Sequence, residues 1–576
     1  MKELTFLIIG AGSRGSAYAR AITSSTPARI AAIAEPVPYK RRIFGEKYIW
    51  GSENPNPSQT FGGWREWIEY EVARRKATSN PESGSGNARN AGEGDQGVDG
   101  VLICTLDETH IEILNALTEN NLLDLHVLCE KPLALSLDDC LSIYAARSKA
   151  QSQSQAIFSI GHVLRYSPHN LLLRRLVRVD KVIGDIVSVE HTEPVGYWHF
   201  AHSYVRGNWR RETEGGDGSL LTKSCHDVDF LRWLVEEPVY PNASPGASAP
   251  TSTKGATQSL PDGHKLSLRS IHSTGHLTQF HPSRKPSAAG SSTNCSTCPI
   301  ERDCIYSALR IYRDNQLRKG ERGWPVNIVC PDIEDYLPPS ALETTSAVST
   351  KEPNGADADI DIVKAETHLL SVLRQDYDDK TSDEEIAKRP WYGRCVWESD
   401  NEVCDDQVVT LSWDTVPLQT KPHNPSSRES KRIPPGITAI LHMTAPTEAQ
   451  CVRRGRIYGT KGEISYDSRQ IRIFDFATHK ITIHDVPKQP PEEEESHGGG
   501  DYGLARGFVG AVDAVVNKGL SVEEAQRGFV GCELGDVIRS HAYVFAAEES
   551  RREEKVVAWE GWWKAKLGEV GVLEAS

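Results

Sequence analysis

The sequence predicts an α/β protein in which an N-terminal doubly wound parallel sheet precedes an α/β domain with a large, mostly antiparallel sheet. Apolar strand segments alternate with helix-forming segments through the first 164 residues, as parallel sheets require. A glycine-rich turn joins the first strand to the first helix. Short strands at hairpin-like spacing occupy much of residues 408–483, which is typical of antiparallel sheets. We therefore predict two domains, at residues 1–164 and 165–576.

The composition indicates that long insertions interrupt these domains. Hydrophobic residues make up 38% of the 576 positions, a low share for compact domains. Polar stretches predict a flexible insertion at 77–97 and further insertions at about 241–264, 282–390 and 486–500. We expect the acidic part of the third insertion, 331–385, to be mobile.

The charge and the cysteine content limit which partners and which cellular compartment are expected. A net charge of −14 without a basic block disfavours nucleic acid and anionic membranes as main partners. The first strand, 4–9, leaves no room for a signal peptide after Met1, and no apolar run of about 18 residues occurs. Twelve cysteines without an export signal indicate reduced thiols. We expect a soluble, cytoplasmic protein.

The glycine-rich turn at residues 10–15, Gly-Ala-Gly-Ser-Arg-Gly, predicts a dinucleotide site in a Rossmann domain. It fits G-x-G-x-x-G between an apolar strand and a helix-forming stretch. Gly10 allows the tight turn, Gly12 lets the backbone approach a pyrophosphate, and Gly15 lets the helix pack on the strand. Free N–H groups of the helix then face the phosphates. A plain glycine turn is the alternative.

The second strand, 29–34, ends in an acidic residue that bears on cofactor choice. The carboxylate of Glu35 can accept hydrogen bonds from the ribose hydroxyls, and it repels a 2′-phosphate. This favours NAD over NADP. The basic residues Arg14, Lys40 and Arg41 keep NADP open, or are simply exposed to solvent.

A later strand, 127–129, ends in Glu130, Lys131 and Pro132. Proline cannot donate to a strand ladder, so pairing stops there. The pair of charges therefore lies at the carboxyl end of a strand, where open α/β sheets bind ligands. Lys131 can act on protons at that edge, and a surface ion pair is the alternative.

Four features together resemble the Gfo/Idh/MocA family of glucose-fructose oxidoreductase and inositol dehydrogenase relatives. They are the glycine turn, Glu35, the turn 105–110 (Thr-x-Asp-x-x-His) and Glu130-Lys131-Pro132. The resemblance implies a Rossmann domain, oxidation or reduction of a sugar or cyclitol carbon with NAD(P), and Lys131 in the active site. The predicted cofactor-binding residues are Gly10, Gly12, Ser13, Arg14, Gly15, Glu35, Thr105, Asp107, His110 and Glu130.

Residues 218–235 are expected to form one helix that presents His226 to the crevice. Thr222, Lys223 and His226 share a face of this helix. Taken alone, His226 reads either as a general base or as a structural histidine. The resemblance implies the base. Relatives have an Asp four positions earlier, where this chain has Thr222, and Lys223 is a candidate for that polar role.

The resemblance also suggests residues that position the substrate. Arg165, Tyr166 and Lys223 are the candidates. Asp227 or Asp229 either orients His226 or pairs within the helix. The aromatic and basic run 197–210 suits a polyol pocket, or alternatively an aromatic domain interface. The glycine-rich segment 497–501 edges the substrate site or forms a surface loop.

Three cysteines lie close together in the third insertion. Cys295, Cys298 and Cys304 follow the spacing C-x2-C-x5-C. Thiolates at this spacing would hold a structural zinc ion, and free cysteines packed in the insertion are the alternative.

The preferred interpretation is an NAD(P)-dependent oxidoreductase of a sugar, sugar acid or cyclitol, with Lys131 and His226 as catalytic residues. Two alternatives come from relatives of other function. One is an NAD-dependent, redox-assisted glycoside hydrolase, and the other is a non-catalytic dinucleotide-binding sensor. The open face of the second sheet implies, by resemblance, a homo-oligomer.

Overall fold

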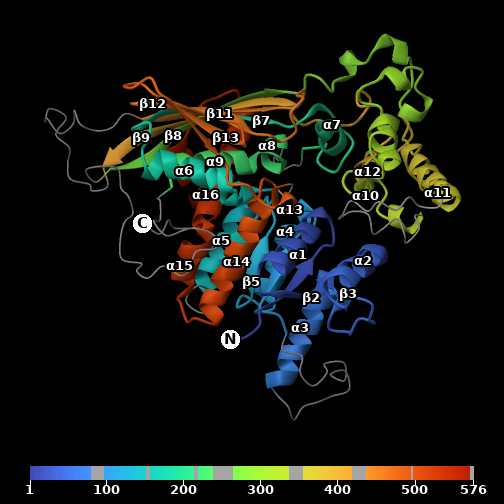
Figure 1. The fold of residues 1–576 in the computed structure, drawn as a ribbon, viewed down its shortest axis with the longest axis horizontal. Helices are drawn as coiled ribbons and strands as arrows, with labels where there is room; N and C mark the ends of the chain where they lie inside the picture. Colours follow the sequence, from blue (N-terminus) through green and yellow to red (C-terminus); the bar gives the residue numbers. More distant parts are fainter. Residues whose placement is uncertain are drawn as a thin grey trace.

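The computed structural model describes eight stretches of the chain, and the elements named below lie within them. These stretches are residues 1–79, 97–150, 156–212, 218–237, 264–336, 355–417, 436–494 and 497–570. Nearly all of the predicted insertions at 77–97 and 241–264 lies outside the described residues. Two sheets organise the fold, and Figure 1 shows the smaller one, with its blue strands, below the larger.

The first sheet is parallel and has the strand order β3-β2-β1-β4-β5-β6. It confirms the predicted Rossmann sheet. The apolar runs become strands buried on both faces, as expected when helices cover both sides. Its elements are β1 Thr5–Ile9, α1 Ser13–Ser25, β2 Arg29–Ala34, α2 Pro38–Tyr48, β3 Thr60–Phe61, α3 Trp64–Ser79, β4 Gly100–Ile103, α4 His110–Glu119, β5 His126–Cys129, α5 Leu137–Ala150 and β6 Phe158–Ile160.

The C-terminal helices return to this first sheet. Helix α14 packs against α1, and the rings of Phe6 and Phe508 lie 5.5 Å apart between centroids. On α16, His541 accepts a hydrogen bond from the N–H of Leu133 at 2.9 Å. The domain boundary after residue 164 stays a prediction, and chain from beyond it completes the first core. The C-terminal helices are α13 Pro491–Glu494, α14 Gly500–Val516, α15 Val522–Ala525, α16 Leu534–Arg552 and α17 Trp559–Val570. Between the last two lies β15 Val557–Ala558, which belongs to the second sheet.

The second sheet has the order β14-β13-β12-β11-β7-β10-β9-β8-β15. All neighbours are antiparallel except β7 and β10, which confirms a mostly antiparallel sheet. The sequence patterns did not predict β8, β12 or β15. Helix α9 lies between this sheet and α16 (Figure 1). The elements are α6 Pro168–Arg174, β7 Ile186–Pro194, α7 Tyr197–Phe200, α8 Ser219–Thr222, α9 Cys225–Val235, β8 His264–His276, β9 Asp406–Pro417, β10 Ile437–Thr444, β11 Arg454–Gly459, β12 Gly462–Tyr466, β13 Gln470–Asp475 and β14 Ile481–Asp485.

The single helix predicted over 218–235 is wrong, because it breaks into α8 and α9 at Lys223 and Ser224. In an unbroken helix the carbonyl of Thr222 would accept the N–H of His226. Here that carbonyl accepts a hydrogen bond from Nζ of Lys131 at 2.6 Å. The break therefore connects the two domains at the predicted active site.

Residues 277–405, between β8 and β9, form what we call the excursion. Its described helices are α10 Val326–Val329, α11 Gly355–Leu373 and α12 Asp383–Ala387. The expectation of a mobile segment over 331–385 is not met for the described part, because α11 buries Ala365, Leu369 and Leu373. Their spacing of four residues makes one apolar stripe along the helix.

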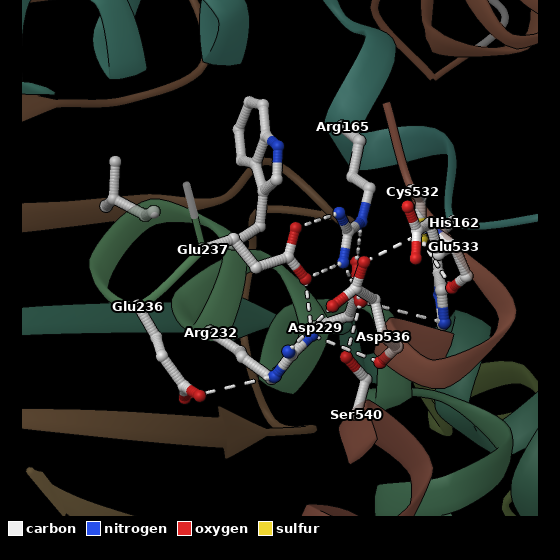
Figure 2. A network of polar contacts seen from close by, with 12 residues as sticks. His162, Arg165, Asp229, Arg232, Glu236, Glu237, Cys532, Glu533, Asp536 and Ser540 are labelled. Atoms are coloured by element: carbon white, nitrogen blue, oxygen red, sulfur yellow. Dashed lines mark hydrogen bonds and ion pairs between the residues drawn. The ribbon is translucent and has the colours of Figure 1, made fainter. Parts of the chain in front are cut away.

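A buried charge network connects Arg165, which follows β6, to α9 and α16 (Figure 2). Arg165 makes paired hydrogen bonds to Asp229 at 2.6 and 2.7 Å and also contacts Glu237. Arg232 contacts Glu237 and Asp536. Such paired charges are buried only where each finds a partner. Among the described residues, no helix is both long and apolar enough to span a membrane.

Candidate active site

A cavity of about 2190 Å³ lies between the two sheets and is lined by both halves of the chain. The first domain contributes the glycine turn and the ends of β2, β4 and β5. The second contributes the α8–α9 break and the residues before β11. The carboxyl ends of the parallel strands open into this space, which is where α/β sheets bind ligands.

The glycine turn has the shape that a dinucleotide pyrophosphate needs. Gly10 has φ +98°, and a Cβ there would lie 2.6 Å from the carbonyl oxygen of Cys104. Gly12 has open space where a side chain would be, so a ligand can approach its backbone. No side chain caps α1, and its first N–H groups stay available for phosphate oxygens. These residues therefore fit the group that the sequence predicts, and Ser13 and Arg14 line the same wall.

Glu35 lies at the end of β2 with its carboxylate held by backbone. Its Oε2 accepts the N–H of Ala11 at 2.8 Å, and its Oε1 accepts the N–H of Val37 at 2.9 Å. Glu35 lines the cavity. The fixed carboxylate is positioned beside the glycine turn, as ribose recognition requires.

Arg14 is held between two carboxylates from distant parts of the chain. Its Nε donates to Glu130 at 2.8 Å and its Nη2 donates to Asp501 at 2.7 Å. Burial alone would raise the pKa of Asp501, but Arg14 and His497 hold it well below its usual range. Glu130 also accepts the hydroxyl of Tyr18 at 2.6 Å. The segment 497–501 thus meets the glycine turn, and His497 and Gly498 line the cavity.

Lys131 and His226 reach the cavity from opposite domains. Lys131 follows β5, and the Thr222 carbonyl at the end of α8 holds its ammonium. His226 lies in the first turn of α9, and its Nδ1 is buried with no hydrogen-bond partner among the described residues. Burial, and then the charges of Lys131, Arg453 and Lys223, lower the pKa of His226 well below its usual 6.5. The imidazole is therefore neutral near pH 7 and able to accept a proton.

Lys223 belongs to a second cluster on the cavity wall. Its Nζ lies 2.9 Å from Sγ of Cys451 and 3.2 Å from Oε1 of Glu193. Burial would lower the pKa of Lys223, but Cys451 and Glu193 raise it above its usual value. Arg453 joins the cluster with Nε 3.1 Å from Glu193. Lys223 therefore reaches the cavity as a paired cation.

Neither acidic residue near His226 contacts its ring. Asp227 accepts hydrogen bonds from His191 and Arg453 at 2.9 and 2.6 Å. Asp229 instead belongs to the network of Figure 2. Both carboxylates pair with side chains outside helix α9, so these contacts correspond neither to orientation of His226 nor to pairing within the helix.

The turn 105–110 holds the active-site backbone. Thr105 lines the cavity, and His110 lies behind it with Nδ1 2.8 Å from the carbonyl oxygen of Pro132. Asp107 accepts a hydrogen bond from Nε1 of Trp209 at 2.8 Å. Burial raises the pKa of Asp107 to about 6. The aromatic run 197–210 accordingly takes part in both roles that its sequence suggested, as cavity wall and as domain contact.

Two predicted substrate residues lie away from the cavity. Arg165 is buried, and Asp229 and Glu237 occupy its guanidinium. Tyr166 is also buried and donates its hydroxyl to the carbonyl of Val530 at 2.8 Å. Both residues come shortly after β6 in the chain, and their side chains are buried in the protein core. Neither side chain lines the cavity where a substrate would lie.

The predicted zinc site is not supported. The described residues contain no group of three or more metal-ligating side chains in suitable positions. Sγ of Cys295 instead accepts hydrogen bonds from Arg206 at 3.4 Å and from the N–H of Ala308 at 3.5 Å. Cys298 and Cys304 are likewise free thiols. Packing in the excursion explains these cysteines without a metal.

Several cavity residues had no signal in the sequence. Trp324 and Ile328 come from the predicted insertion at about 282–390, Tyr392 follows it directly, and Cys451 and Arg453 precede β11. Only tertiary contacts bring these segments to the cavity. The aromatic residues Trp324 and Trp391–Tyr392, in otherwise polar surroundings, were the one available hint.

Two family models match the chain. The model described as "Oxidoreductase family, NAD-binding Rossmann fold" matches residues 72–158. The model described as "Oxidoreductase family, C-terminal alpha/beta domain" matches residues 178–254. The two matches fall in the two domains that contribute to the cavity.

Curated relatives match parts of the chain. 2,7-Anhydro-N-acetylneuraminate hydratase of Escherichia coli (strain K12) is 30% identical over 140 residues, which is 24% of this chain and 34% of that protein. 1,5-Anhydro-D-fructose reductase of Ensifer adhaerens is 28% identical over 214 residues, 36% of this chain and 58% of that protein. Rhizopine catabolism protein MocA of Rhizobium meliloti is 27% identical over 261 residues, 45% of this chain and 65% of that protein. The chain thus spans less than two thirds of each.

Solved structures share the fold over nearly the whole chain. An inositol dehydrogenase homolog from Azotobacter vinelandii, complexed with NAD+, has a TM-score of 0.53 at 12% identity and covers 97% of this chain and 98% of that one. Levoglucosan dehydrogenase in complex with NADH and L-sorbose has a TM-score of 0.52 at 14% identity, with 97% and 99% covered. At these identities the likeness concerns the fold.

Proposed function

Because the chain belongs to the Gfo/Idh/MocA oxidoreductase family, we propose that it is an NAD(P)-dependent oxidoreductase acting on a hydroxyl-bearing carbon of a sugar, sugar acid or cyclitol. The observation that supports this most is the meeting of Lys131 and His226, from different domains, in one cavity beside the glycine turn. An ammonium and a neutral imidazole are the groups that proton removal from a hydroxyl needs.

When bound, the nicotinamide dinucleotide supplies the hydride acceptor or donor. In the oxidative direction, His226 takes the hydroxyl proton at Nε2, since its Nδ1 is buried. Lys131 donates a hydrogen bond from Nζ to the same oxygen and stabilises the negative charge that develops there. The Thr222 carbonyl holds that ammonium in position before substrate binds.

We favour NAD over NADP as the cofactor. The carboxylate of Glu35 is fixed by two backbone N–H groups, and a 2′-phosphate beside it would be repelled. Arg14, the basic residue within the turn, already pairs with Glu130 and Asp501. It is therefore a poor partner for an additional phosphate.

The test of this function is a panel of sugars, sugar acids, cyclitols and simple glycosides supplied with NAD or NADP. We expect at least one member of the panel to reduce NAD to NADH. Reduction of NADP to NADPH with the same substrate should be slower or undetectable. Sugar release without net NADH would instead indicate the redox-assisted hydrolase. Tight NAD binding with no turnover of any member would indicate the sensor. Equal rates with both dinucleotides would remove the preference for NAD.

Because the pKa of His226 is lowered, we predict that kcat/KM for oxidation does not vary with pH through the range in which a histidine usually titrates. A base whose pKa is lowered stays deprotonated as pH falls, so its acid limb moves below pH 6.5. We expect kcat/KM of the wild type to show no inflection from this group between roughly pH 6.5 and 8. The measurement is kcat/KM against pH with saturating NAD.

Asp107 serves as the control for this profile, since its pKa of about 6 lies near the same range. The variant Asp107→Asn removes that titration and leaves the profile of His226. An inflection of kcat/KM near pH 6.5 that persists in Asp107→Asn and disappears from the residual activity of His226→Gln would contradict the lowered pKa of His226.

The protein is further proposed to be a cytoplasmic homo-oligomer. Support comes from exposed apolar side chains on strands β7, β10 and β14, namely Val187, Ile440, Ile481 and Ile483, and from Phe476 directly after β13. Exposed apolar side chains gathered on one sheet are typical of association sites. Molar mass from light scattering checks this, and the mass of a single chain at micromolar concentration would contradict it.

A further inference from the structure

We propose that the cavity accommodates a substrate of two linked rings, a glycoside whose second ring stacks on Trp324 of the excursion. This rests on the proposed function and specifies its substrate class. The first ring would lie at Lys131 and His226. The second would lie against a wall made of Trp324, His199, His202 and neighbouring aromatic residues.

The size of the cavity leaves room for such a ligand. Pockets for single drug-sized ligands occupy roughly 300–1,000 Å³, and this cavity has about 2190 Å³. The dinucleotide would use the part beside the glycine turn and Glu35. The part lined by α7, the excursion and the residues before β11 remains for the substrate.

Trp324 presents an aromatic surface within that second part. Its ring lies 4.9 Å from the ring of His199, 5.4 Å from that of His202 and 5.2 Å from that of Trp198. Tyr392 stacks on His202 from another side at 5.1 Å. Trp324 is 36% exposed while His202 is 2% exposed. The neighbouring rings therefore fix the tryptophan and leave part of it open to a ligand.

The wall carries no charge at neutral pH. Burial lowers the pKa of His199 well below its usual value and that of His202 to about 3. Neutral aromatic surfaces bind the apolar face of a ring and do not favour an anion. The second ring is thus expected to be an uncharged sugar or aromatic group.

A continuous row of contacts connects this wall to the reaction centre. Nζ of Lys223 lies 2.9 Å from Sγ of Cys451, and that sulfur lies 3.4 Å from Nδ1 of His199. His199 in turn touches Trp324. Lys223 precedes His226 by three residues across the helix break. The stacking surface therefore adjoins the space where the first ring would react.

The excursion contacts both domains beside the cavity. It contacts α7 of the second domain through Trp198. It reaches α2 of the first domain, where Arg42 lies 3.7 Å from Asp335. Figure 1 shows the yellow-green excursion beside α7, with α10 and α12 toward α2. The excursion therefore places Trp324 and its neighbouring rings beside the cavity.

Binding of paired ligands tests the proposal. The probes are methyl and phenyl glycosides of glucose, galactose and mannose, titrated by calorimetry into the full chain saturated with NADH, with which a hydroxyl substrate cannot be oxidised. The wild type is expected to bind at least one phenyl glycoside about 5- to 10-fold more tightly than its methyl counterpart, the amount that one aromatic pair contributes. Trp324→Ala should abolish this difference, and Trp324→Phe should keep most of it.

The methyl glycosides are the internal control for folding and for the first ring's site. Their affinity should change less than about twofold in Trp324→Ala, because the first ring does not reach Trp324. Equal losses for methyl and phenyl ligands, or no preference for phenyl glycosides in the wild type, would overturn the proposal. The calorimetric titration measures binding and does not depend on turnover. If no substrate in the panel is oxidised, the proposed reaction is refuted, and the titration still decides whether the second ring binds at Trp324.

Discussion

Replacing Lys131 by methionine is expected to lower kcat for hydroxyl oxidation by about 100- to 1000-fold, the cost of removing one preorganised donor to a developing oxyanion. Methionine keeps most of the apolar stem and removes the ammonium that donates to the Thr222 carbonyl. The affinity for NADH should change little, since Lys131 acts on the substrate oxygen. Steady-state rates on the best panel substrate, together with NADH fluorescence titration, measure both quantities.

Lys564→Met provides the matched control. Lys564 lies on α17 with its side chain 66% exposed and paired to Glu560, and exposed pairs contribute little. We expect wild-type kcat from this variant. Undiminished kcat in Lys131→Met would refute the proposed mechanism, whereas a parallel loss of NADH binding would show that Lys131 supports the cofactor site.

The second large effect concerns stability. Changing Asp229 to asparagine is expected to lower the free energy of unfolding by about 3–5 kcal/mol, because the buried guanidinium of Arg165 loses one of its two carboxylate partners and keeps only Glu237. Arg165, Asp229 and Ser540 are all buried in the network of Figure 2, and Asp229 accepts hydrogen bonds from the other two. Urea unfolding followed by circular dichroism measures the loss.

Two further variants separate this effect from general surface changes. Arg269 and Asp414 form an exposed pair at 3.4 Å, so Asp414→Asn should cost less than about 1 kcal/mol. The double variant Arg165→Met with Asp229→Leu removes both buried charges and should be less destabilised than Asp229→Asn. If Asp229→Asn unfolds at the same urea concentration as Asp414→Asn, the network is not a stabilising one.

The sequence by itself determined the cofactor-binding half of the protein. In that half the chemistry is local: Gly10 and Gly12 are set by turn geometry, and Glu35 and Lys131 lie where strands end. Each depends on residues within a few positions, and parallel strands then bring all strand ends to one edge. The parallel character of the first sheet and the mostly antiparallel second sheet followed from the same local patterns.

Only the tertiary structure decided which residues face the cavity from the second half. Local helix propensity over 218–235 could not reveal the break that offers the Thr222 carbonyl to Lys131, since Lys131 lies 91 positions earlier in the chain. Arg165 lies beside cavity residues in sequence, yet its carboxylate partners come from α9 and the residues after it. Trp324 reaches the cavity only because the excursion folds back against α7. Long-range contacts of this kind depend on how whole elements pack, and no local pattern of residue types records them.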